Sequence, residues 1–227
     1  MIGGLQYASL LTRPDITFAT NKLSQYLENP GKGHWEAAKR VLRYLRGTRT
    51  HALTLGGHRK AHQLQGYVDS DWAECHDTSR STSGYVFSLG SGAVSWSSKR
   101  QSTVATSSCE AEYVAAGHAA KEGIWLRMLL EHLDLKQQKE TLIYMDNQGA
   151  ATLTKDQSFH ARTKHIRVAH HFIRDEVDRK EIAFPYVHTS NNVVDVFTKA
   201  LKPVQHIKLR SKLGLSEQDE SGNPTSS

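Results

Sequence analysis

The sequence is poor in cysteine and has no long apolar run, and these two absences exclude several classes of protein. Its 227 residues include only two cysteines, Cys75 and Cys109. Two cysteines make neither a disulfide framework nor a zinc cluster, so we expect a reducing compartment. No stretch approaches the roughly 20 apolar residues of a membrane span, and no basic segment with an apolar run follows Met1. The sequence therefore predicts a soluble intracellular protein that is not secreted and has no membrane partner.

The charges of the chain are unbalanced towards the positive. It carries 29 Lys and Arg against 23 Asp and Glu, a formal charge of +6, and its pI is near 9.3. This excess favours a polyanionic partner, because Lys and Arg release counterions from phosphates when they bind. Many basic proteins bind no nucleic acid, so the charge alone leaves both interpretations open.

The first candidate functional residues follow a predicted apolar strand at residues 64–68. Because side chains alternate along a strand, Asp69 and Asp71 leave the sheet on the same face. A single D-x-D pattern is more often an ordinary acidic strand end than a site. Asp71 is therefore open to two interpretations, an accessory metal-site residue or a solvated side chain.

Three further acids begin or end other predicted elements. Glu112 lies early in a helix, Asp146 ends a second apolar strand, and Asp195 lies near the start of a late helix. Sheet ends are where such folds gather their ligands. Together with Asp69, these carboxylates form the donor set that a two-metal phosphodiester site needs. Hard oxygen ligands suit two Mg²⁺ or Mn²⁺ ions.

The helix that carries Glu112 also carries a second glutamate near its start. Ser107 and Glu110 match the S-x-x-E capping box, in which both side chains satisfy free backbone amides. Glu112 lies about 200° further around the helix, so it does not share the face of Glu110. We therefore expect Glu110 to cap the helix and Glu112 to be the candidate ligand.

Two predicted helices, near residues 34–46 and 162–179, carry dense positive charge. On each helix an apolar stripe predicts one packed side, and the basic residues of the later helix, Arg174 among them, are expected to point outward. The stripe of the first helix consists of Trp35, Ala38, Val41, Leu42 and Leu45. The basic residues are then either a solvated face or a nucleic-acid contact surface. The candidates for nucleic-acid binding on the later helix are Arg162, Lys164, Arg167 and Arg174.

The order of predicted elements divides the chain into three parts. Residues 1–50 contain two short amphipathic helices, which bury too little surface to fold alone. Residues 51–213 contain three strands that most simply form an antiparallel meander, followed by alternating helices and strands. Residues 214–227 are polar, and we expect a disordered tail.

Several motifs resemble the C-terminal part of the Pol polyprotein of copia-type LTR retrotransposons. Those that resemble the family's ribonuclease H domain are YVDSDWA at 67–73, STSGYVF at 81–87, SSCEAEYVA at 107–115, MDN at 145–147, RTKHI at 162–166 and DVFTKAL at 195–201. Two upstream motifs, RPDI at 13–16 and LRYLRGT at 42–48, resemble the end of that family's reverse transcriptase. The matches cover nearly the whole chain up to the predicted tail.

The resemblance implies an α/β fold of the ribonuclease H type, a mixed five-stranded sheet flanked by helices, with a short N-terminal helical appendage. Residues 1–50 would be a remnant of the thumb or connection of the reverse transcriptase, and residues 51–213 the ribonuclease H-like domain. The expected partners are an RNA·DNA hybrid and the polymerase part of a retroelement reverse transcriptase. The expected location is the cytoplasm, the nucleus or a virus-like particle.

The resemblance also implies the chemistry. Asp69, Glu112, Asp146 and Asp195 would bind the metal ions and hydrolyse the RNA strand of the hybrid. His188 lies in the loop before Asp195, where some ribonucleases H place a histidine that assists product release, although its spacing is a poor match.

One motif of the family is missing. The chain has no adjacent Asp-Asp pair, so the Tyr-x-Asp-Asp motif of a polymerase active site is absent and we expect no DNA synthesis by this chain. The main interpretation is a hybrid-specific ribonuclease. The alternative is a non-catalytic nucleic-acid-binding remnant of a decayed or truncated retroelement, and the presence of all four acids favours the enzyme.

Overall fold

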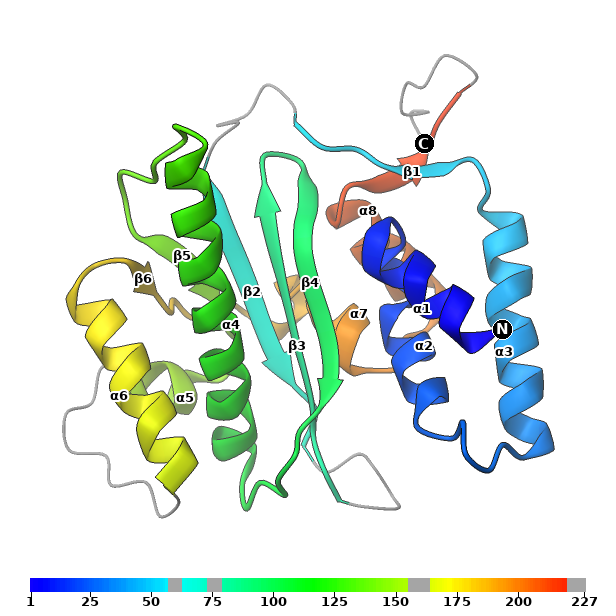
Figure 1. Cartoon of the computed structure of the whole chain (residues 1–227), viewed down its shortest axis with the longest axis horizontal. Coiled ribbons are helices and arrows are strands. Elements are labelled where there is room, and N and C mark those ends of the chain that lie inside the picture. The colour runs from blue at the N-terminus through cyan, green and yellow to red at the C-terminus, as the bar shows by residue number, and fades with distance from the viewer. Residues whose placement is uncertain (57–62, 73–78, 155–163, 220–227) are drawn as a thin grey trace.

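A five-stranded sheet organises the chain, with the strands in the spatial order β4-β3-β2-β5-β6 (Figure 1). The computed structural model describes residues 1–56, 63–72, 79–154 and 164–219. Strands β2, β3 and β4 form an antiparallel meander, and β5 and β6 continue the sheet in parallel with β2. The arrangement confirms the expected mixed five-stranded sheet. The strands are β2 (Leu64–Ser70), β3 (Thr82–Leu89), β4 (Gly92–Arg100), β5 (Thr141–Tyr144) and β6 (Ile182–Ala183).

One face of the sheet is covered by α4 (Ser108–His132), which packs across β2 and β3. Small residues on the inward side of α4, such as Ala115 and Ala119, allow this close approach. At Gly123, an added Cβ would lie 3.1 Å from the ring of Phe87. Helices α5 (Gln148–Leu153) and α6 (Lys164–Asp178) pack against α4 and extend this layer.

The opposite face of the sheet has its own apolar cluster. Along β3, Phe87 belongs to the cluster under α4, whereas Val86 packs with residues of α7 (Asp195–Thr198) and α8 (Pro203–Lys212). The short helix η2 (Thr189–Asn191) precedes α7. The sheet is therefore buried on both faces, and α7 reaches the same end of β2 as the start of α4.

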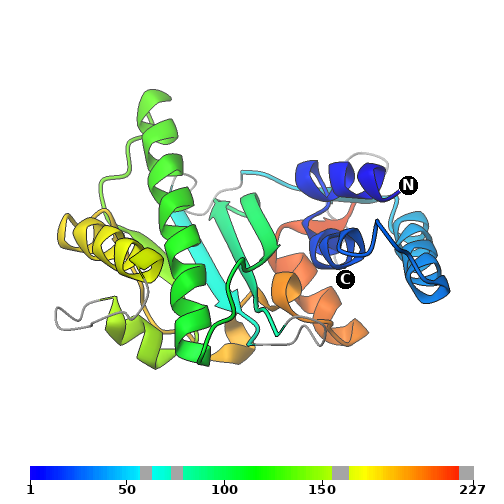
Figure 2. The same ribbon diagram turned by 60° about the horizontal axis from the view of Figure 1, so that its bottom comes forward.

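The N-terminal helices form a second unit beside β4, the edge strand of the sheet. Figures 1 and 2 show them at the opposite end of the molecule from α6. The backbone carbonyl of Ser98 in β4 accepts a hydrogen bond from the side chain of Asn21, and the indole of Trp96 donates to the carbonyl of Ser9 at 2.8 Å. These contacts cover a strand edge that would otherwise be free to pair with another chain. The elements are α1 (Ile2–Leu11), η1 (Pro14–Ile16), α2 (Thr17–Ser24) and α3 (Lys32–Gly47).

Two features of this unit differ from the sequence-based expectation. The sequence did not predict α1, whose Leu5 packs with Ile16 in a small separate core. On α3, Trp35 and Leu42 belong to the predicted apolar stripe, yet they are 54% and 41% exposed. Of this stripe, Ala38 and Val41 are buried in the small core, and the half-buried Leu45 packs against it.

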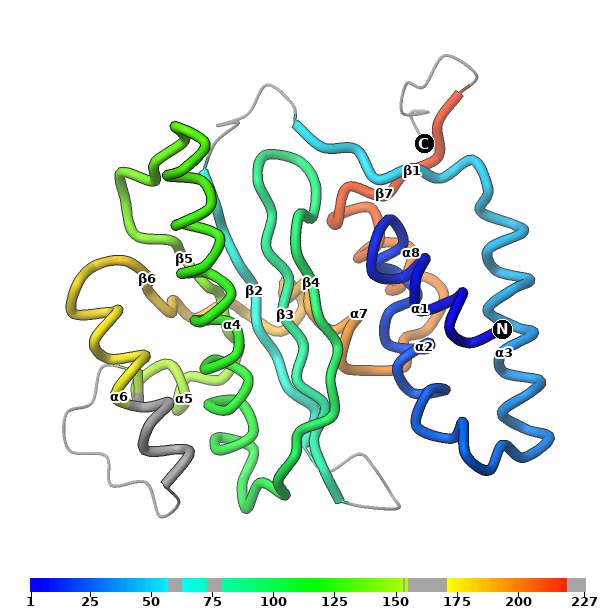
Figure 3. Tube along the Cα trace, in the orientation of Figure 1, coloured from blue at the N-terminus to red at the C-terminus, as the bar shows by residue number. Residues whose placement is uncertain are grey.

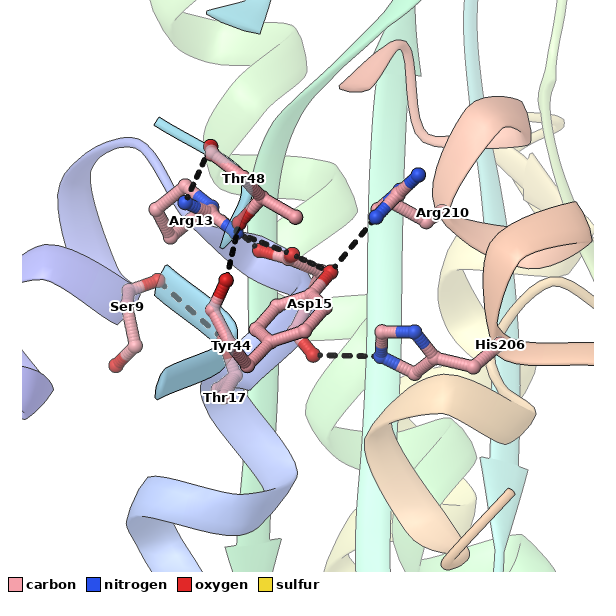
Figure 4. A network of polar contacts seen from close by, with 8 residues as sticks. All are labelled: Ser9, Arg13, Asp15, Thr17, Tyr44, Thr48, His206 and Arg210. Carbon is pink, nitrogen blue, oxygen red and sulfur yellow. Dashed lines mark hydrogen bonds and ion pairs between the residues drawn. The ribbon is translucent and has the colours of Figure 1, made fainter. Parts of the chain in front are cut away.

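A buried polar network joins the N-terminal unit to α8 (Figure 4). Asp15, whose side chain is fully buried, accepts two hydrogen bonds from Arg13 at 2.9 and 2.8 Å. The hydroxyl of Tyr44 donates to Asp15 at 2.5 Å and accepts from Arg210 of α8 at 3.0 Å. Burial, followed by the negative charge of Asp15, raises the pKa of Tyr44 to about 12. The ring of His206, also on α8, contacts the backbone carbonyl of Asp15 at 3.1 Å.

The expected tail is wrong at its start. Residues Leu215–Glu217 form strand β7, which pairs antiparallel with β1 (His51–Leu53), so the two strands run side by side in Figure 3. Leu213 and Leu215 are buried and anchor the segment, and Gly214 adopts a φ of +84° that suits glycine. The residues around Leu213 and Leu215 are mostly polar, so composition alone did not indicate that this segment is anchored. The remainder of the expected tail, residues 220–227, lies outside the described residues.

Among the described residues, no helix combines the length and the apolar character needed to cross a membrane.

We expect Tyr44→Phe to lower the free energy of unfolding by about 1–3 kcal/mol, because it removes the hydrogen bond that Asp15 accepts from Tyr44 and the one that Arg210 donates to it. Tyr7→Phe is the matched control, since Tyr7 is 69% exposed. Urea denaturation of both variants measures the difference. An unchanged midpoint for Tyr44→Phe would show that the network does not stabilise the junction.

Candidate active site

Three of the four predicted acids meet at one end of the sheet. Asp69 lies near the end of β2, and Asp146 follows β5 after one further residue, so the two parallel strands carry them to the same edge. Glu112 comes from the beginning of α4. One carboxylate oxygen from each of the three residues lies within 4.8 Å of the others. Strand direction and helix position thus place three negative charges together.

Glu112 is buried, and its two carboxylate oxygens have different surroundings. Its Oε1 accepts a hydrogen bond from the backbone amide of Ser70 at 3.2 Å. Its Oε2 is buried and has no N–H or O–H donor among the described residues. Burial, followed by the charge of Asp69, raises the pKa of Glu112 to about 9, against an ordinary value of 4.5. A buried carboxylate oxygen without a donor is what a cation would satisfy.

Asp69 is held from the other face of the sheet by α7. Its Oδ2 accepts a hydrogen bond from the hydroxyl of Thr198 and lies 3.2 Å from the ammonium of Lys199. Gly84 pairs opposite Asp69 in the ladder between β2 and β3. An added Cβ on Gly84 would lie 2.8 Å from the methyl group of Thr198. The absence of a side chain at Gly84 therefore lets α7 approach Asp69.

Asp195, the fourth predicted acid, opens α7 and is buried beside this group. Its Oδ1 accepts from Lys199 at 2.9 Å and its Oδ2 from Gln205 at 3.4 Å. The pKa of Asp195 is raised by burial, and the charges of Asp69 and Asp146 act in the same direction against the ammonium of Lys199. Just before α7, the fully buried Asn192 donates to the backbone carbonyl of Val68 at 3.2 Å. This bond ties the segment that carries Asp195 to β2, one residue before Asp69.

The structure describes both possible accessory residues, Asp71 and His188. Asp71 is only 4% exposed, so the interpretation as a solvated side chain is wrong. Its carboxylate accepts from the backbone amide of Thr82, and its own amide donates to the carbonyl of Thr82 at 3.1 Å. Asp71 thus braces β2 against β3. His188 is exposed and caps η2, where its Nδ1 contacts the amide of Ser190 at 3.3 Å and the hydroxyl at 2.9 Å.

The basic surface predicted on the later helix is described only in part. Arg162 lies outside the described residues, as do the side chains of Lys164 and Arg167. Arg174 was expected to point outward, but it is half-buried. Its charge lies near Tyr113 of α4, where it opposes the rise that burial causes in the pKa of Tyr113. The inward position follows from the packing of α6 against α4.

The capping role expected at the start of α4 is confirmed with one change. The Ser107 hydroxyl accepts from the amide of Glu110 at 3.1 Å, as a capping box requires. The Glu110 carboxylate accepts instead from the amide and hydroxyl of Thr106, at 2.7 and 2.6 Å. Glu110 and Glu112 therefore occupy separate environments.

The donor set fits a hard divalent cation. Asp69, Glu112 and Asp146 offer three carboxylates at mutual distances that one ion can bridge, and Oε2 of Glu112 is free of a competing donor among the described residues. Carboxylate oxygens are the ligands that Mg²⁺ and Mn²⁺ prefer. The mixed sheet with acids gathered at this end defines a ribonuclease H-like fold with a candidate metal site.

Comparison with known proteins agrees with this class. The chain is 47% identical over 200 residues to the retrovirus-related Pol polyprotein from transposon TNT 1-94 of Nicotiana tabacum, which covers 88% of this chain and 15% of that protein. It is 41% identical over 217 residues to the corresponding polyprotein from transposon RE2 of Arabidopsis thaliana, covering 95% of this chain and 15% of that protein. The secreted RxLR effector protein 161 of Plasmopara viticola is 49% identical over 127 residues, which are 55% of this chain and 87% of that protein.

The chain belongs to the copia-type family of retrovirus-related Pol polyproteins. It spans 15% of the length of each of the first two relatives. No protein-family model matches the chain.

Two solved structures align with parts of this chain. LC11-RNase H1, isolated from compost, is 17% identical, with a TM-score of 0.45 over 60% of this chain and 93% of that chain. The foamy viral protease-reverse transcriptase dRH in complex with double-stranded DNA is 13% identical, with a TM-score of 0.50 over 83% of this chain and 31% of that chain. Because the foamy viral chain is only 13% identical, its similarity to this chain concerns the fold alone.

Sequence reasoning did not identify the polar residues that hold the acids. These are Asn192, Thr198, Lys199 and Gln205. One signal was present, because Asp195 and Lys199 stand four residues apart, the spacing of an ion pair on a helix. The contacts with Asp69 depend on how α7 lies on β3, and no local pattern in the sequence shows this.

The raised pKa of Glu112 predicts how stability without metal depends on pH. Between about pH 5 and pH 9 the folded protein keeps a proton on Glu112 that the unfolded chain releases, so the free energy of unfolding falls as the pH rises. The slope contributed by this one group is at most about 1.4 kcal/mol per pH unit. Glu112→Gln removes the effect.

Urea denaturation in EDTA at pH 5.5 and pH 8.5 tests this prediction. We expect Glu112→Gln to gain stability relative to the unmodified protein as the pH rises. Parallel behaviour of the two proteins would contradict the raised pKa. Titrating groups far from Glu112 are common to both proteins and cancel in the comparison.

Proposed function

We propose that this chain is a retroelement ribonuclease H that hydrolyses the RNA strand of RNA·DNA hybrids with two divalent cations, Mg²⁺ or Mn²⁺. The observation that carries the proposal is the convergence of Asp69, Glu112 and Asp146 within 4.8 Å, in a chain of a Pol polyprotein family with a ribonuclease H-like sheet. Asp195, which shares Lys199 with Asp69, is the fourth proposed catalytic acid.

The four carboxylates would hold the cations at the end of β2. When bound, the cations supply a Lewis acid that activates water and stabilises the leaving oxygen of the phosphodiester. The protein supplies the fixed positions: the Ser70 amide holds Glu112, Thr198 holds Asp69, and Gln205 holds Asp195. Because burial raises the pKa of Glu112, a cation bound to this carboxylate would take the place of a proton.

The proposed substrate is an RNA·DNA hybrid bound through its phosphates. The positive charge of the chain supports a polyanionic ligand, and the proposed phosphate contacts are Arg162, Lys164 and Arg167. Such contacts position a duplex without selecting its sequence. We further propose that residues 1–50 derive from the thumb or connection of a reverse transcriptase and that this side of the chain faces the polymerase part.

Asp69→Asn and Asp146→Asn should each abolish Mg²⁺-dependent cleavage of a labelled RNA·DNA hybrid, because each replaces a negative ligand by a neutral group of the same shape. Glu110→Gln is the matched control on α4. It should cleave normally while losing about 1 kcal/mol of stability, the typical value of a helix cap.

Circular dichroism establishes that each variant is folded. Near-normal cleavage by either Asn variant would contradict the metal site. Loss of cleavage in Glu110→Gln at unchanged stability would reverse the roles of the two glutamates. Hybrid binding without any cleavage by the unmodified chain would favour the non-catalytic alternative.

The double variant Lys164→Gln and Arg167→Gln tests the phosphate contacts. We expect it to raise KM more than it lowers kcat and to flatten the dependence of log affinity on log salt by about one unit per lost contact. Lys139→Gln is the control, because Lys139 is exposed before β5, at the end of that strand away from Asp146. Binding is measured in Ca²⁺ over a salt series. An unchanged salt slope would assign these residues to a solvated helix face.

A further inference from the structure

We infer that Lys199 is a positioning residue that serves as an internal counter-cation: it holds Asp69 and Asp195 together before a divalent cation arrives, and it competes with that cation for the two carboxylates. This inference deepens the proposed function and rests on it. It concerns the chain's own side chains at the Asp69–Asp195 side of the site.

The geometry assigns Lys199 to both acids at once. Its ammonium lies 3.2 Å from Oδ2 of Asp69 and 2.9 Å from Oδ1 of Asp195. The side chains of these acids are only 2% and 6% exposed, so water screens their mutual repulsion poorly. One positive charge placed between two buried negative charges offsets that repulsion. Lys199 is thus positioned where a cation is electrostatically required.

The two sides of the acid cluster are satisfied in different ways. On one side, the ammonium of Lys199 bridges Asp69 and Asp195. On the other, Asp69, Glu112 and Asp146 approach one another, and Oε2 of Glu112 has no donor among the described residues. Asp69 belongs to both sides. A divalent cation that takes Asp69 or Asp195 as a ligand must therefore weaken or replace a contact with Lys199.

The Lys199 side chain reaches solvent, so a cation can displace its ammonium from the two acids. Its side chain is 32% exposed, whereas the acids that it bridges are buried. A flexible ammonium stem that reaches solvent can withdraw into water without its own charge being left buried. Gly84 and Thr198 fix the approach of α7, so the position of the lysine backbone does not depend on the ion pair alone.

The test compares Lys199→Met, Lys199→Arg and the control Lys202→Met, which removes an exposed lysine three residues away. Thermal melting is recorded in EDTA and with increasing Mn²⁺, and Mn²⁺ binding is followed by calorimetry without nucleic acid. We expect Lys199→Met to melt lower than the unmodified protein in EDTA and to gain more from Mn²⁺. The weaker of the two expected Mn²⁺ sites should bind Mn²⁺ at least about tenfold more tightly than in the unmodified protein, because a competing charge at contact distance has been removed.

Lys199→Arg keeps the charge and should behave like the unmodified protein, as should Lys202→Met. A merely structural lysine would lower the melting temperature in Lys199→Met and leave Mn²⁺ affinity unchanged or weaker, and that result would overturn the inference. If Lys199→Met does not fold in EDTA, Lys199→Gln, which retains a hydrogen-bond donor, gives the same comparison.

The role of Lys199 and the proposed ribonuclease activity can fail separately. Normal hybrid cleavage by the unmodified protein, with no gain of Mn²⁺ affinity in Lys199→Met or Lys199→Gln, overturns the role of Lys199 alone. Tighter Mn²⁺ binding by these variants, with no cleavage by the unmodified protein in Mg²⁺, supports the role of Lys199 and overturns the proposed function.

Discussion

The repulsion among four carboxylates gathered at one end of a sheet is the constraint on which the local structure depends. Asp69, Glu112 and Asp195 are buried, so solvent does little to separate their charges. The protein offsets this repulsion with a proton, through the raised pKa of Glu112, and with an ammonium, through Lys199. Under the proposed metal binding, a divalent cation would supply this positive charge in place of the proton and the ammonium.

The rest of the molecule positions the elements that meet at this cluster. Small residues on α4 bring Glu112 to the end of β2 from one face of the sheet, and Gly84 brings α7 with Thr198 and Lys199 from the other. The N-terminal helices cover the edge strand β4 and are bound to α8 through Tyr44 and its partners. Because α8 also supplies Gln205 to Asp195, contacts through α8 join the helical unit to the site.

Much of this arrangement was predictable from local patterns. The alternation of β2 placed Asp69 on the face opposite Val68, and strand ends predicted that Asp146 would join it. Features set by long-range packing were not predictable. Asp71 braces Thr82, Leu215 anchors an unexpected strand, and Lys199 reaches Asp69, each through a contact with a distant segment. Trp35 shows the converse, since its place on an apolar stripe predicted burial that the small N-terminal core does not provide.

We propose that this chain cleaves RNA paired with DNA at its acidic cluster. The most direct measurement incubates the unmodified chain with an RNA·DNA hybrid, an RNA duplex and a DNA duplex of the same sequence, in Mg²⁺ and in EDTA. The account predicts cuts in the RNA strand of the hybrid only, in Mg²⁺ only, leaving 3′-hydroxyl ends. An intact hybrid in the presence of folded protein and Mg²⁺, or cleavage that persists in EDTA, would contradict it.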